Sequence, residues 1–410
     1  MRSYLFLMVL VLIGCKNPDR THLSQNPILP KKEIVFEGLN RPWSIAFLND
    51  NEALVTEKNG DMVKIDLQKQ TKKIIKGFPE DLTDSIGAVH VGDNSGIFEV
   101  LLHPNFKENQ KIYFSYAAKK KGVGKTTKFV QAQLENDSLT HLKTILVAEP
   151  FAYINYHYGG GMAIGPDQKL YLTVGERLFW EHDEPALPIA QDPTDPRGKI
   201  HRFNLDGTIP EDNPQFGEDA VPSIFAMGIR NTQGLALQPE TGNLWFTEHG
   251  TIQGDEINIL KAGANYGWPN STTGRLRSED YKPPRLHGVE FTPPAWFWHH
   301  TVAPTGLCFY TGDEFPQWKN NLLVPGLSRG SLWRFHLEGD TLKSAEELFL
   351  DDRIRSRKVA QSPSGKLYLL TDEENGKIIR IVPEKTQKKL KEGKSPERIT
   401  SQLSLIPIGG

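Results

Sequence analysis

Short apolar segments alternate with polar turns along the whole chain, and the same arrangement recurs about every fifty residues. Each repeat begins with an apolar pair and a turn that contains proline, glycine or an acidic residue. A strand-like segment of the type Leu-Tyr/Trp-apolar-Thr and an acidic residue follow, and a second strand carries Arg or Lys. No long apolar stretch has the period of an amphipathic helix. The six copies lie at residues 44–65, 100–115, 162–203, 235–248, 307–335 and 359–381.

Six copies of a strand-rich unit predict radial repetition, because a small sheet buries its faces only when neighbouring sheets stack against it. We therefore predict an all-β fold, a six-bladed β-propeller, in one domain over residues 33–383. Two β-sandwiches in tandem are the alternative. They would need a linker near the middle of the chain, and no Pro- or Ser-rich break occurs there.

The first residues indicate an export signal and not a part of the fold. A positive charge at Arg2 precedes an apolar run over residues 5–13, and residues 12–15 read Leu-Ile-Gly-Cys, which matches a bacterial lipobox. This run is too short to span a bilayer as a helix, which needs roughly twenty residues, whereas its length suits a signal peptide. A buried N-terminal strand is the alternative interpretation.

We accordingly expect a signal peptide over residues 1–14 and a mature chain that begins at Cys15. A lipid on Cys15 would anchor an exported lipoprotein on the periplasmic side, at the outer membrane, because Lys16 gives no signal for retention at the inner membrane. Residues 15–32 are expected to form a polar tether, and residues 384–410 a polar C-terminal tail. The membrane leaflet is left open.

Charge and cysteine content narrow the possible functions. The formal net charge is −2 over 410 residues, which gives no electrostatic footprint for nucleic acid. The second cysteine, Cys308, lies in an apolar, strand-like segment and is expected to be a thiol of the core. If Cys15 carries a lipid, Cys308 has no partner for an intramolecular disulfide.

Candidate catalytic chemistry is expected in loops, because the blades of a propeller direct their connecting loops at a central mouth. His157 precedes a predicted strand that begins with three glycines, and Glu176 ends the strand that follows. An imidazole in this place could act as a general base, and the carboxylate could orient it or raise its basicity. The alternative is a hydrogen-bonded loop histidine without a catalytic role.

Three arginines are candidates for binding an anionic ligand. The planar guanidinium of Arg230, next to Asn231, suits contacts with carboxylates or quinone oxygens, although it could instead brace loop carbonyls. Arg353 and Arg355 are two residues apart, so strand geometry would put both on one face. Two like charges side by side favour an anion between them.

A Gly-rich acidic turn is a candidate cation site. Gly250 and Thr251 are followed by Asp255 and Glu256, and backbone carbonyls and carboxylates are the hard oxygen ligands that calcium prefers. A plain turn is the alternative.

Taken together, these segments resemble the soluble glucose/sorbosone dehydrogenase family, which depends on pyrroloquinoline quinone (PQQ), and most of all its aldose sugar dehydrogenase branch. The resemblance extends from about residue 38 to 382, and its Arg-Asn and Gly-Asp-Glu-Ile-Asn segments are specific. The matching motifs are RPWSIAF (41–47), GGMAIGPD (160–167), GIRNTQG (228–234), GDEIN (254–258), ANYGWP (264–269), VAPTG (302–306) and LLTDEENG (369–376). The family also implies a six-bladed propeller.

The resemblance implies a role for each candidate residue. His157 would be the catalytic base that takes the proton of the sugar C1 hydroxyl, while a hydride leaves for PQQ, and Glu176 would orient it. Arg230 and Asn231 would lie at the quinone side of the cofactor. The other implied roles are PQQ binding by Asn94, Thr301, Arg353 and Arg355, coordination of the PQQ-bound calcium by the carbonyls of Gly250 and Thr251, and a second, structural calcium near Glu256 and Tyr266.

Some positions depart from the family pattern. Ser328 stands where the family has a lysine on PQQ, residues 93–96 read Asp-Asn-Ser-Gly where the family has Gln-Gly/Asn-Gly, and Thr251 replaces a proline. Residues 177–180 do not resemble the family's sugar-contacting loop. These departures put glucose as the substrate in doubt.

We predict a PQQ- and calcium-dependent oxidoreductase that oxidises an aldose or related sugar at the anomeric carbon. Its electron acceptor and its oligomeric state are left open. One alternative is a propeller that binds a sugar or a partner without turnover. Another is a calcium-dependent lactonase in which Glu176 or Asp255 holds a central metal.

Overall fold

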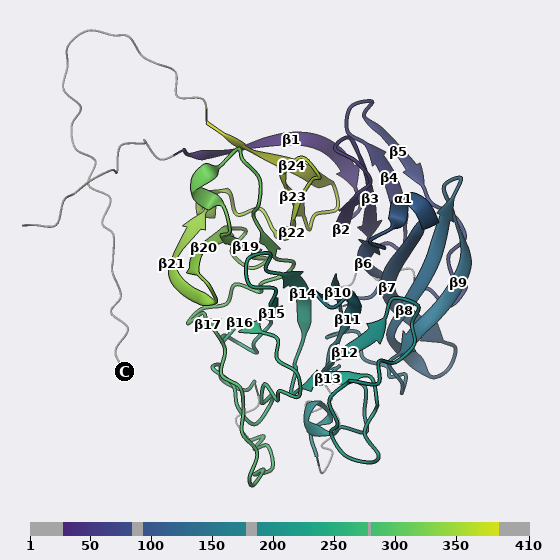
Figure 1. The fold of residues 1–410 in the computed structure, drawn as a ribbon, viewed down its shortest axis with the longest axis vertical. Coiled ribbons are helices and arrows are strands. Elements are labelled where there is room, and N and C mark those ends of the chain that lie inside the picture. Colours follow the sequence, from purple (N-terminus) through teal and green to yellow (C-terminus); the bar gives the residue numbers. More distant parts are fainter. Residues whose placement is uncertain (1–27, 84–92, 178–186, 278–279, 385–410) are drawn as a thin grey trace, which may run out of the picture. The chain divides into compact units, whose positions relative to one another are not determined.

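Four-stranded antiparallel sheets account for almost all regular structure in the computed structural model, which describes residues 28–83, 93–177, 187–277 and 280–384. Figure 1 shows the six sheets arranged as blades around a centre, within a unit that spans Pro30–Val382. The predicted all-β, six-bladed β-propeller is confirmed. No helix in the described part of the chain is long and apolar enough to cross a membrane.

Each blade takes consecutive strands from its inner to its outer edge, except that the sixth ends on the first strand of the chain. Blades 1 to 3 consist of β2 (Pro42–Phe47), β3 (Glu52–Glu57), β4 (Met62–Asp66) and β5 (Thr71–Ile74); β6 (Ile97–Leu102), β7 (Lys111–Lys120), β8 (Gly124–Glu135) and β9 (Ser138–Val147); and β10 (Gly159–Ile164), β11 (Lys169–Val174), β12 (Lys199–Asn204) and β13 (Ile224–Met227).

Blades 4 to 6 consist of β14 (Thr232–Leu237), β15 (Leu244–Glu248), β16 (Glu256–Ile259) and β17 (Trp296–Phe297); β18 (Cys308–Phe309), β19 (Leu322–Pro325), β20 (Leu332–Glu338) and β21 (Thr341–Leu348); and β22 (Ser356–Gln361), β23 (Leu367–Thr371), β24 (Gly376–Pro383) and β1 (Pro30–Leu39). Within the described residues the helical segments are single turns: α1 (Phe106–Asn109), η2 (Ile189–Gln191), η3 (Pro316–Trp318) and η4 (Leu350–Asp352).

The two ends of the propeller sequence meet in blade 6, where β1 pairs with β24. Contacts beyond the sheet strengthen this closure. The backbone N–H of Arg41 donates to the carbonyl of Glu373 at 2.8 Å, and the Arg41 guanidinium forms an ion pair with Glu374 at 3.0 Å. The ring therefore cannot open without loss of a strand from blade 6.

Apolar clusters between neighbouring blades form the core. Leu54 of blade 1 packs with Phe114 of blade 2, and Val55 of blade 1 packs with Leu370 of blade 6. The clusters follow from the alternation in the sequence, because each blade can bury its two faces only against its neighbours. Cys308 is partly buried and free, and burial raises the pKa of its thiol to about 11, as suits an unreactive core cysteine.

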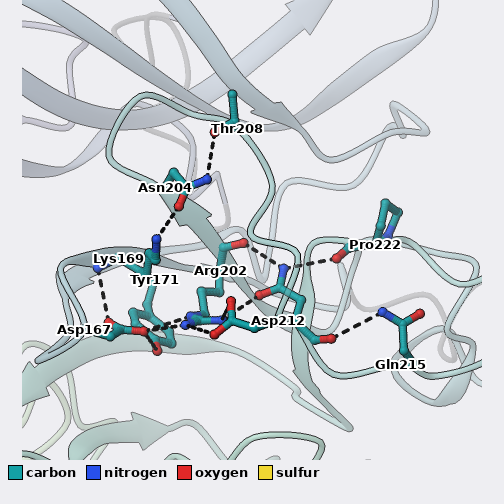
Figure 2. A network of polar contacts seen from close by, with 10 residues as sticks. Asp167, Lys169, Tyr171, Arg202, Asn204, Thr208, Asp212, Gln215 and Pro222 are labelled. Atoms are coloured by element: carbon teal, nitrogen blue, oxygen red, sulfur yellow. Dashed lines mark hydrogen bonds and ion pairs between the residues drawn. The ribbon is translucent and has the colours of Figure 1, made fainter.

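A polar network fixes the loop after β12 to blade 3 (Figure 2). Arg202 donates to both carboxylate oxygens of Asp212, at 2.9 and 3.0 Å, and to Asp167 at 2.9 Å. Tyr171 donates to the same Asp167 carboxylate at 3.0 Å. These groups satisfy one another's charges, so this network supports the blade.

The expected signal peptide, Cys15 and nearly all of the tether and tail lie outside the described residues. Export and lipid anchoring therefore stay predictions.

Candidate functional site

The candidate residues gather at one end of the blades because of the antiparallel order. In each blade the start of the innermost strand and the end of the next strand lie side by side. The pairs Gly159–Val174, Thr232–Glu248 and Ser356–Thr371 are in register. Side chains just before the first strand and just after the second strand of a blade therefore face the same mouth.

His157 and Glu176 meet at this mouth in blade 3. Nδ1 of His157 is 2.5 Å from Oε1 of Glu176, and both side chains are largely buried. The backbone of His157 is left-handed, with φ of 51°, and a Cβ on Gly175 would lie 2.0 Å from its carbonyl oxygen, so glycine is required there. Glu176 thereby occupies Nδ1 and leaves Nε2 as the nitrogen that can accept a proton.

The environment keeps the His157 imidazole neutral. Burial, and after it the positive charge of Arg230, holds the pKa of His157 well below its usual value near 6.5. Asn231 supports the loop, since its Oδ1 accepts a hydrogen bond from the backbone N–H of Gly159 at 3.1 Å. A neutral imidazole in a fixed orientation is the form that a general base needs.

Arg230 both braces a loop and keeps an unused donor. Its guanidinium donates to the carbonyl of His249 at 3.0 Å and lies over the ring of Trp268, 5.2 Å from the centroid. Its Nε is buried and has no hydrogen-bond partner within the described structure. The bracing role and the anion-binding role left open by the sequence are therefore compatible.

The geometry expected for Arg353 and Arg355 does not hold, because β22 begins only at Ser356. Arg353 lies after η4, exposed, with a left-handed backbone. Arg355 is half-exposed and donates to Asp372 at 3.0 Å. Arg357 lies two residues after Arg355 and inside β22. Sequence reasoning missed Arg357, although the same two-residue spacing could have indicated it.

Arg357 is buried and connects two blades. It donates to Asp372 of blade 6 at 2.8 Å and to Oε1 of Gln233 of blade 4 at 2.6 Å, while its Nε has no partner among the described residues. It shares one cavity with His157. The residues that line this cavity are Trp43, Lys58, Asn94, Phe98, His157, Tyr158, Gly159, Gln233 and Arg357.

The cavity thus brings together His157 and Asn94 of the predicted set. Thr301 and Arg353 are not among its lining residues. Thr301 is exposed, and its hydroxyl donates to the carbonyl of Ile252. It lies beside Val302, at a contact between the loops of blades 4 and 5.

Asp255 organises the turn at Gly250. Its Oδ1 accepts the Gly250 N–H at 2.8 Å, and its Oδ2 accepts the N–H groups of Val302 and Ala303, each at 2.7 Å. Both carboxylate oxygens are therefore used by the backbone. Asp255 therefore holds the Gly250–Thr251 turn against the loop of blade 5.

A second cavity, which contains two carboxylates, adjoins this turn at Gly250. Glu248 and Glu256 are paired across β15 and β16, and both line the cavity with Tyr266. Oε2 of Glu248 and Oδ1 of Asn258 are buried without hydrogen-bond partners in the described part of the chain. Burial, and then the charge of Glu256, raises the pKa of Glu248 to about 8. Burial also raises the pKa of Glu256.

These unpaired oxygens fit a hard cation, which would remove the cost of burying two carboxylates together. The Tyr266 hydroxyl is already used, since it donates to the carbonyl of Ile259 at 2.5 Å, so only its backbone could contribute a ligand. Groups of three or more His, Cys, Asp or Glu side chains with metal-binding geometry are absent from the residues that the structure describes.

Comparison with known proteins identifies the family. Residues 39–380 match the family model of glucose/sorbosone dehydrogenase. The chain is 31% identical to the aldose sugar dehydrogenase YliI of Escherichia coli over 87% of this chain and 94% of that protein. It is 29% identical to quinoprotein glucose dehydrogenase B of Acinetobacter calcoaceticus, over 83% and 85% of the two chains.

The solved structures agree. The apo-form of the soluble E. coli aldose sugar dehydrogenase superposes with a TM-score of 0.77 at 30% identity, covering 87% of this chain and all of that one. The family predicted from the motifs is therefore confirmed. With a match over nearly the whole propeller, the chain belongs to the glucose/sorbosone dehydrogenase family.

Proposed function

We propose that the protein is a PQQ- and calcium-dependent dehydrogenase that oxidises an aldose or related sugar at its anomeric carbon. The observation that carries this proposal is the buried His157–Glu176 pair, which opens into a cavity lined by residues of five blades. The quinoprotein name of the Acinetobacter relative and the sugar dehydrogenase name of the E. coli relative support the same reaction class.

In this proposal the residues of the chain supply position and proton transfer. Nε2 of His157 takes the proton of the C1 hydroxyl, and Glu176 stabilises the imidazolium that forms. PQQ, when bound, accepts the hydride. Arg230 faces the side where negative charge develops on oxygen, and its partnerless buried Nε fits an acceptor there.

The proposed cofactor contacts rest on Arg357, which lines the cavity, and on Arg355, which donates to the same Asp372. Arg355 and Arg357 would bind carboxylates of PQQ, since the Nε of Arg357 is a buried donor without a partner among the described residues. The carbonyls of Gly250 and Thr251 would hold the calcium ion that polarises the quinone, in the turn that Asp255 fixes. Glu248, Glu256 and Asn258 would hold a second calcium ion.

A titration tests the proposal. Metal-free protein is titrated with PQQ, with and without calcium, and absorbance is followed. Saturable binding that requires calcium, and reduction of a dye by some aldose, are the expected results. A wild-type protein that fails to bind PQQ in the presence of calcium contradicts the proposal. Hydrolysis of a lactone without PQQ would favour the lactonase, and sugar binding without redox activity would favour the binding propeller.

The second calcium site predicts a change in stability. Saturating calcium is expected to raise the melting temperature of the metal-free protein by about 3–4 °C, from binding linkage at roughly one hundred times the dissociation constant. Glu256→Gln, which removes one charge at nearly constant shape, should remove most of this shift. Scanning calorimetry with and without calcium measures it. An equal shift in wild type and variant would exclude a calcium ion bound by Glu256.

A further inference from the structure

A buried arginine contacts the loop that carries His157. Arg177 follows Glu176 directly in the chain, and it is 0% exposed. Burial lowers the pKa of Arg177 to about 10, so its guanidinium is still charged at neutral pH. Its backbone is left-handed, with φ of 68°, which is uncommon for a residue with a side chain. Such backbone strain persists where the surrounding contacts fix it, and it gathers at functional sites.

The Arg177 guanidinium donates three hydrogen bonds to backbone carbonyls. Nε donates to the carbonyl of Tyr156 at 2.9 Å, Nη1 donates to that of Lys125 at 3.1 Å, and Nη2 donates to that of Ile154. Two of these carbonyls belong to the loop just before His157, and the third belongs to β8 of blade 2. A planar guanidinium holds its donors in a fixed fork, so three acceptors bound at once have little freedom to move relative to one another.

The same guanidinium also contacts the residue after His157. The central carbon of the Arg177 guanidinium lies 3.9 Å from the centroid of the Tyr158 ring, in a cation–π contact. Tyr158 packs in turn against Phe98, at 5.3 Å between ring centroids, and both residues line the cavity together with His157. Arg177 therefore holds the chain on both sides of His157.

These contacts fix the backbone of His157, whereas Glu176 fixes its side chain through Nδ1 at 2.5 Å. Glu176 and Arg177 are successive residues just after β11, so one short segment supplies both contacts. The imidazole is thus fixed before a ligand enters the cavity. Such placement matters for turnover, because a displacement of about 1 Å at a reacting group can cost roughly a hundredfold in rate.

The charge of Arg177 also acts on the imidazole. A positive charge nearby disfavours the imidazolium, so Arg177 contributes with burial, Arg230 and His249 to the low pKa of His157. The charged or titratable groups around the imidazole are Glu176, Arg177, Arg230, His249 and Arg277, and Lys58 and Arg357 line the same cavity.

We propose that Arg177 is a positioning residue for the general base: it fixes the backbone on both sides of His157 and so keeps the imidazole between Glu176 and the cavity. Arg177 acts through His157 and is not itself a catalytic residue. This inference deepens the proposed function and rests on it for the effect on turnover. The effect on the imidazole itself requires no cofactor.

Three variants of the full-length protein test the role of Arg177. Arg177→Met keeps an apolar stem and removes the donors and the charge, whereas Arg177→Lys keeps the charge and loses the planar fork. Arg202→Met is the matched control, because Arg202 is a buried arginine of the same blade that binds Asp167 and Asp212 (Figure 2). Melting temperatures establish that each variant is folded.

The first measurement is sugar oxidation with calcium, expressed as kcat per bound PQQ. Arg177→Met is expected to lower this kcat roughly 10- to 100-fold, while the affinity for PQQ and the KM for the sugar stay near the wild-type values. Arg177→Lys should lie between Arg177→Met and wild type. Arg202→Met should lower the melting temperature and leave kcat per bound PQQ unchanged.

The second measurement follows the His157 imidazole by NMR in the metal-free protein, labelled with ¹⁵N-histidine and titrated with acid. Comparison with His157→Ala identifies the signal. In wild type the imidazole should stay neutral, with its proton on Nδ1, as the pH falls through 6.5. Loss of a positive neighbour raises the pKa of His157, so the imidazolium should form at a higher pH in Arg177→Met. Arg177→Lys should again be intermediate.

Three outcomes overturn the inference: a wild-type kcat per bound PQQ in Arg177→Met, a His157 titration unchanged from wild type, or an equal loss of kcat in Arg202→Met. If Arg177→Met does not fold, Arg177→Lys decides by the same two measurements. A wild-type protein that binds no PQQ contradicts the proposed redox function, and the NMR titration then decides alone whether Arg177 positions His157.

Discussion

Replacement of His157 by alanine is expected to lower kcat for sugar oxidation by roughly 10²- to 10⁴-fold, the range lost with a general base. His157 is held by Glu176 at 2.5 Å, so the base is fixed before substrate binds. Dye reduction by the protein loaded with PQQ and calcium measures kcat. PQQ binding should be unchanged, which separates loss of the base from loss of the cofactor. A His157→Ala variant with more than a tenth of wild-type kcat would exclude the assigned role.

The pH dependence of kcat/KM tests the role of His157 as the general base in a second way. Because burial and Arg230 lower the pKa of His157 well below 6.5, the imidazole remains neutral and active as the pH falls through 6.5. The acid limb of kcat/KM is therefore expected below pH 6.5. Glu176→Gln removes the carboxylate that stabilises the imidazolium, so it should move this limb to still lower pH and reduce kcat.

Replacement of Asp255 by alanine is expected to lower the free energy of unfolding by about 3–5 kcal/mol, because three backbone N–H groups, all of them at least partly buried, lose a charged acceptor. These groups belong to Gly250, Val302 and Ala303, so the change separates the loops of blades 4 and 5. Urea denaturation of the metal-free protein measures the effect. Calcium affinity at the site proposed for the Gly250–Thr251 carbonyls should fall as well.

Asp255→Asn serves as the matched control, since it keeps the shape and one acceptor oxygen. Asp255→Asn should lower the free energy of unfolding by less than the alanine variant does, but by more than a substitution of an exposed residue does. An alanine variant within about 0.5 kcal/mol of wild type, which is the usual range of surface substitutions, would show that the three contacts do not hold the loops.

The repeat was predictable because it is local. Alternation within 44–65 or 359–381 needs only neighbouring residues, and the strands found there follow it. The family motifs likewise identified His157 and Glu176, whose side chains the structure joins. The ends of the strands were harder to predict from the sequence. Arg353 and Arg355 lie in a loop, and β22 begins only after them, at Ser356.

Contacts between distant segments could not be predicted from spacing. Asp255 has the residue type of a calcium ligand, but its partners at Val302 and Ala303 come from the next blade. In the same way, Lys58 and Asp372 approach each other only because the ring closes. Such pairs depend on the tertiary arrangement, which a single sequence does not reveal.

The pairing of β1 with β24 also determines when the protein can finish folding. The last blade receives its outermost strand from the start of the chain, so a ribosome must release nearly the whole polypeptide before that blade is complete. Until then the edge of β24 lacks its neighbouring strand in the nascent protein, and the ring is not closed.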